Sequence, residues 1–171
     1  MKLQTILKRI DLPIEWIGKA VSWFILPLSL IMLGDITIRE IRGYPTIWAW
    51  ETAYMLCGSL FMLSAAYILR IGGHIRIDFL HERFSPRAKA IIELIFYIVI
   101  FFPLIAIGVK YGIDFAEWSW SIRELAPSPS SWNQPLYPFK TVLPLAFLLL
   151  GIQGVAEFVR NLMFVVRGTG K

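Results

Sequence analysis

The stretch RIGGHIRIDFLHERFSPRAK, residues 70–89, decides the fold because it is a long polar segment between two apolar runs. It holds five of the 17 Lys and Arg residues in the chain. The uncharged run 52–69 ends at Arg70, and a second apolar run begins after Lys89. At about 1.5 Å per residue, a helix over 52–69 covers roughly 27 Å of a hydrocarbon core about 30 Å thick. Two membrane-spanning helices are therefore predicted to meet at this segment, the 70–89 connector.

The composition of the whole chain agrees with a lipid environment. Hydrophobic residues make up 57% of the 171 residues and charged residues only 17%, which is more apolar surface than a soluble domain of this size can bury. The net charge of +5 does not indicate a nucleic-acid partner, since the basic residues lie between apolar runs and form no continuous basic face. The single cysteine, Cys57, excludes an intrachain disulfide.

The apolar runs predict an all-α integral membrane protein with four transmembrane helices in a single domain, residues 1–171. The predicted spans are approximately 20–38, 52–69, 90–110 and 141–163. Asp11 and Pro13 suit the cap and first turn of the first helix. Pro27 and Pro103 predict kinks within the first and third spans. Helical spacing of apolar residues after Asp114 predicts that the third helix continues beyond the bilayer.

The distribution of basic residues predicts the orientation of the four spans. The N-terminal segment, the 70–89 connector and the C-terminal tail together hold 12 Lys and Arg residues, and the other two connectors hold five. This bias predicts that both termini and the amphipathic 70–89 connector lie in the cytoplasm. The Trp- and Pro-rich segment 114–140 is then expected on the outer side.

The sequence contains no recognisable catalytic or cofactor-binding machinery. It has no P-loop and no G-x-S-x-G motif, so we expect no enzyme activity. A haem subunit needs imidazoles inside the bundle, whereas His74 and His81 both lie in the 70–89 connector. A metal site from His74, Asp78 and His81 is conceivable at helical spacing, but no further Cys or His completes the ligand set, which favours a solvated interfacial helix. Neither a cofactor nor a metal ion is expected.

Ionisable residues near the ends of the spans are candidates for partner contacts. Their simplest interpretation is interfacial solvation or local ion pairing, for example between Glu157 and Arg160. Glu51 opens the second span, where it either complements the helix dipole or binds a partner subunit. The 70–89 connector either lies in the head-group layer with its arginines on phospholipid phosphates, or forms a polar knot of Arg70, Arg76 and Asp78.

The segment RIGGHIRID, residues 70–78, carries a family resemblance. Together with Trp50 and Glu51 at the start of the preceding span, it resembles the signature of the small permease subunit of tripartite ATP-independent periplasmic (TRAP) transporters, the DctQ family. The segment 85–87, SPR, resembles the start of the third span of that family, and KTVLPLAFLLLGIQG, residues 140–154, resembles the fourth. The resemblance extends over nearly the whole chain.

This resemblance implies a non-enzymatic, multi-pass subunit of the bacterial inner membrane. Its implied partners are a large permease that holds the substrate and sodium sites and moves like an elevator, and a periplasmic binding protein that delivers an organic acid. Residues expected to contact structure, partner or lipid are Glu51, Arg70, Gly73, His74, Arg76 and Asp78. Residues expected either to dock the binding protein or to anchor the chain at the membrane interface are Trp118, Trp120 and Trp132. The alternatives are a stand-alone small transporter or channel, and a membrane anchor for a redox complex.

Overall fold

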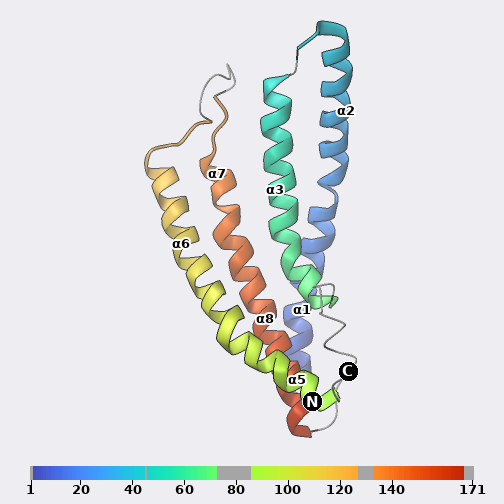
Figure 1. The fold of residues 1–171 in the computed structure, drawn as a ribbon, viewed down its shortest axis with the longest axis vertical. Helices are drawn as coiled ribbons and strands as arrows, with labels where there is room; N and C mark the ends of the chain where they lie inside the picture. Colours follow the sequence, from blue (N-terminus) through green and yellow to red (C-terminus); the bar gives the residue numbers. More distant parts are fainter. Residues whose placement is uncertain (1, 45, 73–85, 127–132, 168–171) are drawn as a thin grey trace.

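The protein is an elongated helical bundle (Figure 1). The computed structural model describes residues 2–44, 46–72, 86–126 and 133–167. The helices are α1 (Lys2–Ser22), α2 (Ile25–Arg42), α3 (Ile47–Arg70), α5 (Pro86–Phe96), the π-helix η1 (Tyr97–Phe101), α6 (Phe102–Ser121), α7 (Tyr137–Lys140) and α8 (Val142–Arg167). Figure 1 shows α1 beginning and α8 ending at the same end of the bundle, which we call the terminal end.

Four helical stretches are long and apolar enough to cross a membrane. They are Leu7–Arg42, Ile47–Arg70, Arg87–Ser121 and Tyr137–Val166. Each contains one of the four predicted spans, and the predicted fold class of an all-α, four-helix membrane protein is confirmed. The helices extend beyond the apolar runs, and α3, which begins at Ile47, has Trp48 and Trp50 in its first turn.

The first span is broken one turn before Pro27, as the sequence predicts. Pro27 has no N–H to donate to the carbonyl of Trp23, which accepts from Leu26 N–H instead, at 3.2 Å. Trp23 and Phe24 form a turn between α1 and α2. The predicted cap at Asp11 is wrong: α1 begins at Lys2 and contains Pro13 in its interior. Residues 2–22 form one continuous amphipathic helix, so Asp11 lies inside it, where its carboxylate pairs with arginines of α3 and α8.

The third span bends at a π-helix. Phe102 N–H bonds to the carbonyl of Tyr97, five residues back, immediately before Pro103. Pro103 has no N–H to donate, and the extra residue in the π-helical turn lets the helix continue past this missing donor. The predicted distortion therefore occurs one turn before the proline. The helix then continues to Ser121, in agreement with the predicted extension beyond the bilayer.

Glycines permit close contacts between the spans. A Cβ atom added to Gly154 of α8 would lie 2.1 Å from the Phe101 ring, and one added to Gly108 of α6 would lie 2.6 Å from the Phe147 ring. Gly18 of α1 meets the Tyr67 ring of α3 in the same way. Because lipid gives no hydrophobic drive for helices to associate, van der Waals packing at such positions holds the bundle together.

Candidate functional site

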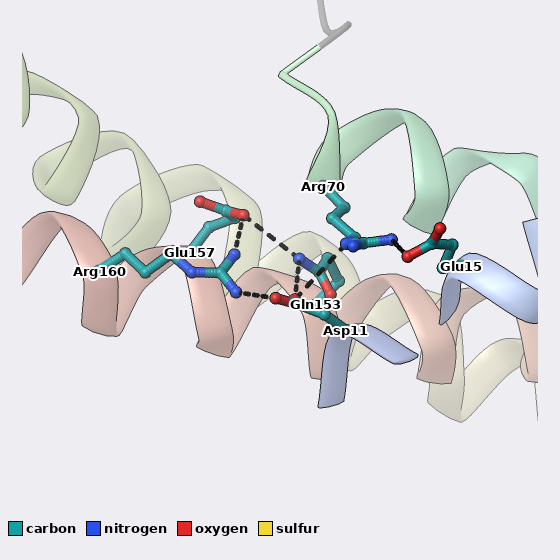
Figure 2. Close-up of polar contacts among 6 residues, drawn as sticks. All are labelled: Asp11, Glu15, Arg70, Gln153, Glu157 and Arg160. Carbon is teal, nitrogen blue, oxygen red and sulfur yellow. Dashed lines mark hydrogen bonds and ion pairs between the residues drawn. The ribbon is translucent and has the colours of Figure 1, made fainter. Parts of the chain in front are cut away.

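Six polar residues from three helices meet near the terminal end of the bundle (Figure 2). Helix α1 contributes Asp11 and Glu15, α3 contributes its last residue, and α8 contributes three side chains at successive helical turns. We call this group the charge cluster: Asp11, Glu15, Arg70, Gln153, Glu157 and Arg160. Charged side chains near the membrane boundary are costly unless they are paired, so their convergence needs a physical account.

Asp11 is the centre of the charge cluster. Its Oδ2 atom lies 2.5 Å from Arg160 Nη2, and its Oδ1 atom lies 3.9 Å from Arg70 Nε. Gln153 Nε2 also donates to Asp11 Oδ1, at 3.4 Å. One carboxylate of α1 is thereby joined to both α3 and α8, which fixes the axial position of α1 against the two other helices.

Arg70 extends the charge cluster along α1. Its Nη1 atom lies 2.7 Å from Glu15 Oε2, and Lys19 Nζ donates to the other oxygen of Glu15 at 2.6 Å. The C-terminus of α3 is an electrostatically favourable place for a cation, because the helix dipole is negative there. Arg70 is thus held both by its own helix and by the first helix.

The α8 side of the charge cluster is the most buried. Gln153 is fully buried, and its amide nitrogen donates to Glu157 Oε1 at 3.3 Å as well as to Asp11. Arg160 pairs with Glu157 on its own helix and with Asp11 across the interface. With Lys19, three cations face three carboxylates, so the group is electrically balanced. Balance and convergence identify the charge cluster as a structural clamp between α1, α3 and α8.

A second polar group lies at the opposite end, where residues 124–126 after α6 pair with residues 134–136 before α7; we call these two segments, with Asn133, the hairpin. Ala126 N–H donates to the Gln134 carbonyl at 2.8 Å, and Leu136 N–H donates to the Glu124 carbonyl at 2.9 Å. The Glu124 carboxylate accepts hydrogen bonds from Lys140 and, at 2.7 Å, from Ser119. These two hydrogen bonds, with that from Lys140 the stronger, lower the pKa of Glu124 below its usual value.

The predicted tryptophans near this hairpin differ in their surroundings. Trp118 is 57% exposed, with Lys140 Nζ 5.7 Å from its ring centroid. Trp120 donates from Nε1 to Thr141 Oγ1 at 2.9 Å and contacts the Tyr137 ring with centroids 4.5 Å apart, although it too is half exposed. Trp132 lies outside the described residues. Trp118 is thus the more available of the two for an external partner.

The other predicted contact residues have mixed outcomes. Arg70 lies in the charge cluster, but its partners are carboxylates of α1 that the sequence did not indicate. The predicted pair of Glu157 with Arg160 is present. Gly73, His74, Arg76 and Asp78 lie outside the described residues, as does His81, so the proposed polar knot and the conceivable metal site stay predictions.

Glu51 lies far from the charge cluster, as the fifth residue of α3. Its Oε2 atom is buried and has no hydrogen-bond partner within the part of the chain that the structure describes. Neither of its two predicted roles, at the helix dipole or at a partner, is decided by this position.

Sequence reasoning missed Asp11, Glu15 and Gln153 as members of a site. Asp11 and Glu15 are four residues apart on an amphipathic helix, which places them on one face. Gln153 is a polar residue within an otherwise uncharged span. These two signals together indicate an interhelical polar contact in a membrane protein, but they do not identify its partners.

Four long apolar helices whose charged residues gather near their ends define a multi-pass membrane protein. A family model described as "Tripartite ATP-independent periplasmic transporters, DctQ component" matches residues 28–163. The chain belongs to this family: it is a small permease component of a TRAP transporter, and so a transporter component and not an enzyme. No curated protein and no solved structure gives a match.

Proposed function

We propose that this chain is a static scaffold subunit of the bacterial inner membrane. In this proposal it holds a large, sodium-coupled permease that moves like an elevator, and a periplasmic binding protein delivers an organic acid to the complex. The family supports membership in a tripartite transporter. The sodium coupling, the substrate class and the elevator motion belong to the proposal.

The observation that carries the scaffold role is the lack of charge in the central part of each span. Residues 20–34, 52–69, 94–109 and 141–156 contain no Asp, Glu, Lys, Arg or His. A secondary transporter that works alone usually has ionisable residues near the middle of the bilayer to couple ion and substrate movement. The charge cluster instead connects helices near one end, which favours a rigid scaffold over a transport pathway.

Co-purification and reconstitution test this role. The chain is expressed with a large permease encoded beside it, and the two are expected to purify as a complex. In liposomes, the complex with its binding protein is expected to take up an organic acid along a sodium gradient, and the chain alone is expected to give no flux. Sodium-driven uptake by the chain alone would overturn the scaffold role and favour a stand-alone transporter.

The proposed orientation places the terminal end of the bundle in the cytoplasm, on the evidence of the charge bias. Cys57 is replaced by serine, and a single cysteine is introduced as Asn133→Cys in the hairpin or as Arg87→Cys near the terminal end, both at exposed positions. In intact cells with the outer membrane permeabilised, an impermeant maleimide is expected to label the Asn133→Cys variant only. Labelling of the Arg87→Cys variant alone would reverse the orientation.

Docking of the binding protein is proposed to use Trp118, near the end of α6 that leads into the hairpin. Its exposure supports this role, although membrane-interface anchoring explains the same exposure. We expect Trp118→Ala to lower uptake at limiting binding protein, with recovery at higher concentrations. Trp16→Ala is the matched control, because Trp16 is an exposed tryptophan of α1 toward the other end of the bundle. Equal loss in both variants would favour anchoring.

Arg70 is proposed to act on the permease indirectly, by positioning the end of α3 against α1. Arg70→Gln is then expected to lower the yield of the complex more than it alters the apparent substrate affinity. Glu51 is proposed as a direct partner contact, and Glu51→Gln is expected to lower complex yield without changing the thermal stability of the isolated chain. An unchanged yield for Glu51→Gln would refute the partner contact, and the interaction with the helix dipole would then be the role of Glu51.

A further inference from the structure

Helix α3 meets the hairpin and α7 through one of its faces, at the end of the bundle opposite the charge cluster. Residues at i, i+3, i+4 and i+7 lie on the same side of a helix, and we call the four at this contact the hairpin face: Glu51, Tyr54, Met55 and Gly58. Gln134 Nε2 donates to Met55 Sδ at 3.1 Å. The ring centroids of Tyr54 and Phe139 are 6.0 Å apart, and a Cβ atom added to Gly58 would lie 3.0 Å from the Phe139 ring. The hairpin face therefore packs against Gln134 and Phe139.

Two buried oxygen atoms at this contact have no hydrogen-bond donor. Glu51 Oε2 and Gln134 Oε1 are both buried, and neither accepts a hydrogen bond within the part of the chain that the structure describes. Glu51 lies one turn before Met55, whose sulfur contacts Gln134, so the two oxygens belong to the same contact. A carboxylate and an amide carbonyl are both acceptors, and they cannot satisfy each other.

Little at this contact offsets the cost of the two oxygens. A buried acceptor that loses water and gains no donor weakens a contact by a factor on the order of ten. The hydrogen bond from Gln134 Nε2 adds little in return, because a thioether is a weak acceptor. Gln153 Oε1 is a third buried oxygen without a partner among the described residues, but it lies in the charge cluster, where ion pairs compensate.

The elements on the two sides of the contact are held differently. The hairpin is fixed to α6 and α7 by two backbone hydrogen bonds and by the pair of Glu124 with Lys140. Helix α2 packs mainly against α3, and Figure 1 shows these two helices diverging from α6 toward this end. At the terminal end, Arg70 holds α3 in the charge cluster. Glu51 is 19 residues from Arg70. It therefore lies about 28 Å from Arg70 along the helix, and a tilt of about 6° about that residue moves Glu51 by about 3 Å, the width of a water molecule.

We propose that the contact between the hairpin face and Gln134 opens in the native protein. Helices α2 and α3 tilt away from the hairpin together, water reaches Glu51 and Gln134, and the charge cluster keeps the terminal end closed. The bundle thus has one fixed end and one end that opens. Opening makes the buried carboxylate of Glu51 available to the partner contact proposed above. The opening itself needs no partner, so its test is independent of the scaffold role.

Distances between spin labels on the full-length chain in lipid nanodiscs test the proposal. Cys57 is replaced by serine, and labels are attached at Ile41→Cys of α2 and Asn133→Cys of the hairpin, both exposed positions. We expect two distance populations for this pair, one for the closed contact and one for the open contact. A second pair, Trp16→Cys with Arg87→Cys near the terminal end, is expected to give one population. A single population for the first pair would overturn the proposal, because the contact would then stay closed in spite of the two unpaired oxygens.

Apolar substitutions show whether the two oxygens cause the opening. In the double variant Glu51→Leu with Gln134→Leu neither acceptor remains, so the ratio of open to closed populations should fall at least about tenfold. Gln134→Leu alone removes one acceptor and should lower the ratio at least about threefold. Glu117→Leu is the control, because Glu117 is an exposed carboxylate of α6, and it should leave the ratio unchanged. An unchanged or higher ratio in the double variant would refute the proposal. If the double variant does not fold, the same result in Gln134→Leu refutes it.

Discussion

Replacing Arg160 by glutamine is expected to destabilise the bundle, because the carboxylates of Asp11 and Glu157 lose the guanidinium that pairs with them. The Arg160 side chain is 25% exposed, and those of its partners Asp11 and Glu157 are 16% and 13% exposed. Breaking a buried ion pair costs roughly 3–5 kcal/mol, and an exposed pair contributes about 1 kcal/mol or less. For a pair about three-quarters buried, the expected loss is about 2–3 kcal/mol, or on the order of 5–10 °C in thermal midpoint.

A double-mutant cycle separates this interaction from general damage to α8. Arg160→Gln, Asp11→Asn and the double variant are purified in the same detergent, and their thermal midpoints and unfolding free energies are compared. Each single variant breaks the Asp11–Arg160 pair but keeps one of its two charges, whereas the double variant removes both charges, so a coupling of about 1–2 kcal/mol is expected. Arg39→Gln is the control, because Arg39 is an exposed arginine of α2 that should contribute little.

Two results would refute the clamp. If the losses in the two single variants simply added in the double variant, Asp11 and Arg160 would act independently and the ion pair would not join α1 to α8. If Arg160→Gln lowered the midpoint no more than Arg39→Gln, the charge cluster would be solvated at the membrane boundary and would contribute little to stability. A positive coupling with normal helix content supports the geometry of Figure 2.

Three further predictions concern other parts of the bundle. Gly154→Ala should cost roughly 1–3 kcal/mol in thermal unfolding, because its new Cβ would lie 2.1 Å from an aromatic ring. Gly34→Ala, which has nothing within 4 Å, should be neutral or stabilising by up to about 1 kcal/mol. Because the Lys140 hydrogen bond lowers the pKa of Glu124, its contribution to the stability of the hairpin is complete above the ordinary pKa of a glutamate and is lost as the pH falls through the lowered folded-state pKa. Amide exchange in the hairpin, corrected for intrinsic rates, should show this loss of protection, and Lys140→Gln should move its onset to higher pH. Asp35→Ala should lower the midpoint by the equivalent of about 1 kcal/mol, because it removes the acceptor for the first N–H before α3, 2.7 Å away; an unchanged midpoint would show that water replaces this bond.

The four spans follow from the sequence because their signal is local. Each apolar run is long enough to require a lipid environment, and Pro27 and Pro103 remove hydrogen-bond donors wherever they occur in a helix. The ends of the helices are predicted less accurately from the sequence. The start of α1 contains Lys8 and Arg9 and gives no apolar run, and the sequence therefore placed the first turn at Asp11. Amphipathicity, and not hydropathy, is the signal that extends this helix to Lys2.

The charge cluster could not be derived from the sequence because its contacts are long-range. Asp11 and Arg160 are 149 residues apart in the chain, and Gln153 is 142 residues from Asp11. The sequence indicates that ionisable groups lie near the span ends, but several pairings are possible among them. The choice depends on which helices are neighbours and on their relative heights, and both are set by side-chain packing such as that of Gly154 against Phe101.

The position of the charge cluster near one end of the bundle has a physical consequence for a scaffold. In lipid, apolar helices slide and rotate against one another at little cost, because the hydrophobic effect does not distinguish a protein neighbour from a lipid tail. Glycine contacts restrict the distance between α6 and α8, but α1 needs a further constraint along its axis. Asp11 supplies it by pairing with α3 and α8 at once, since a shift of one turn, about 5.4 Å, would separate both pairs. In the proposed scaffold role the subunit must resist such shifts, and the ion pairs at Asp11 provide that resistance without placing a charge in the middle of the bilayer.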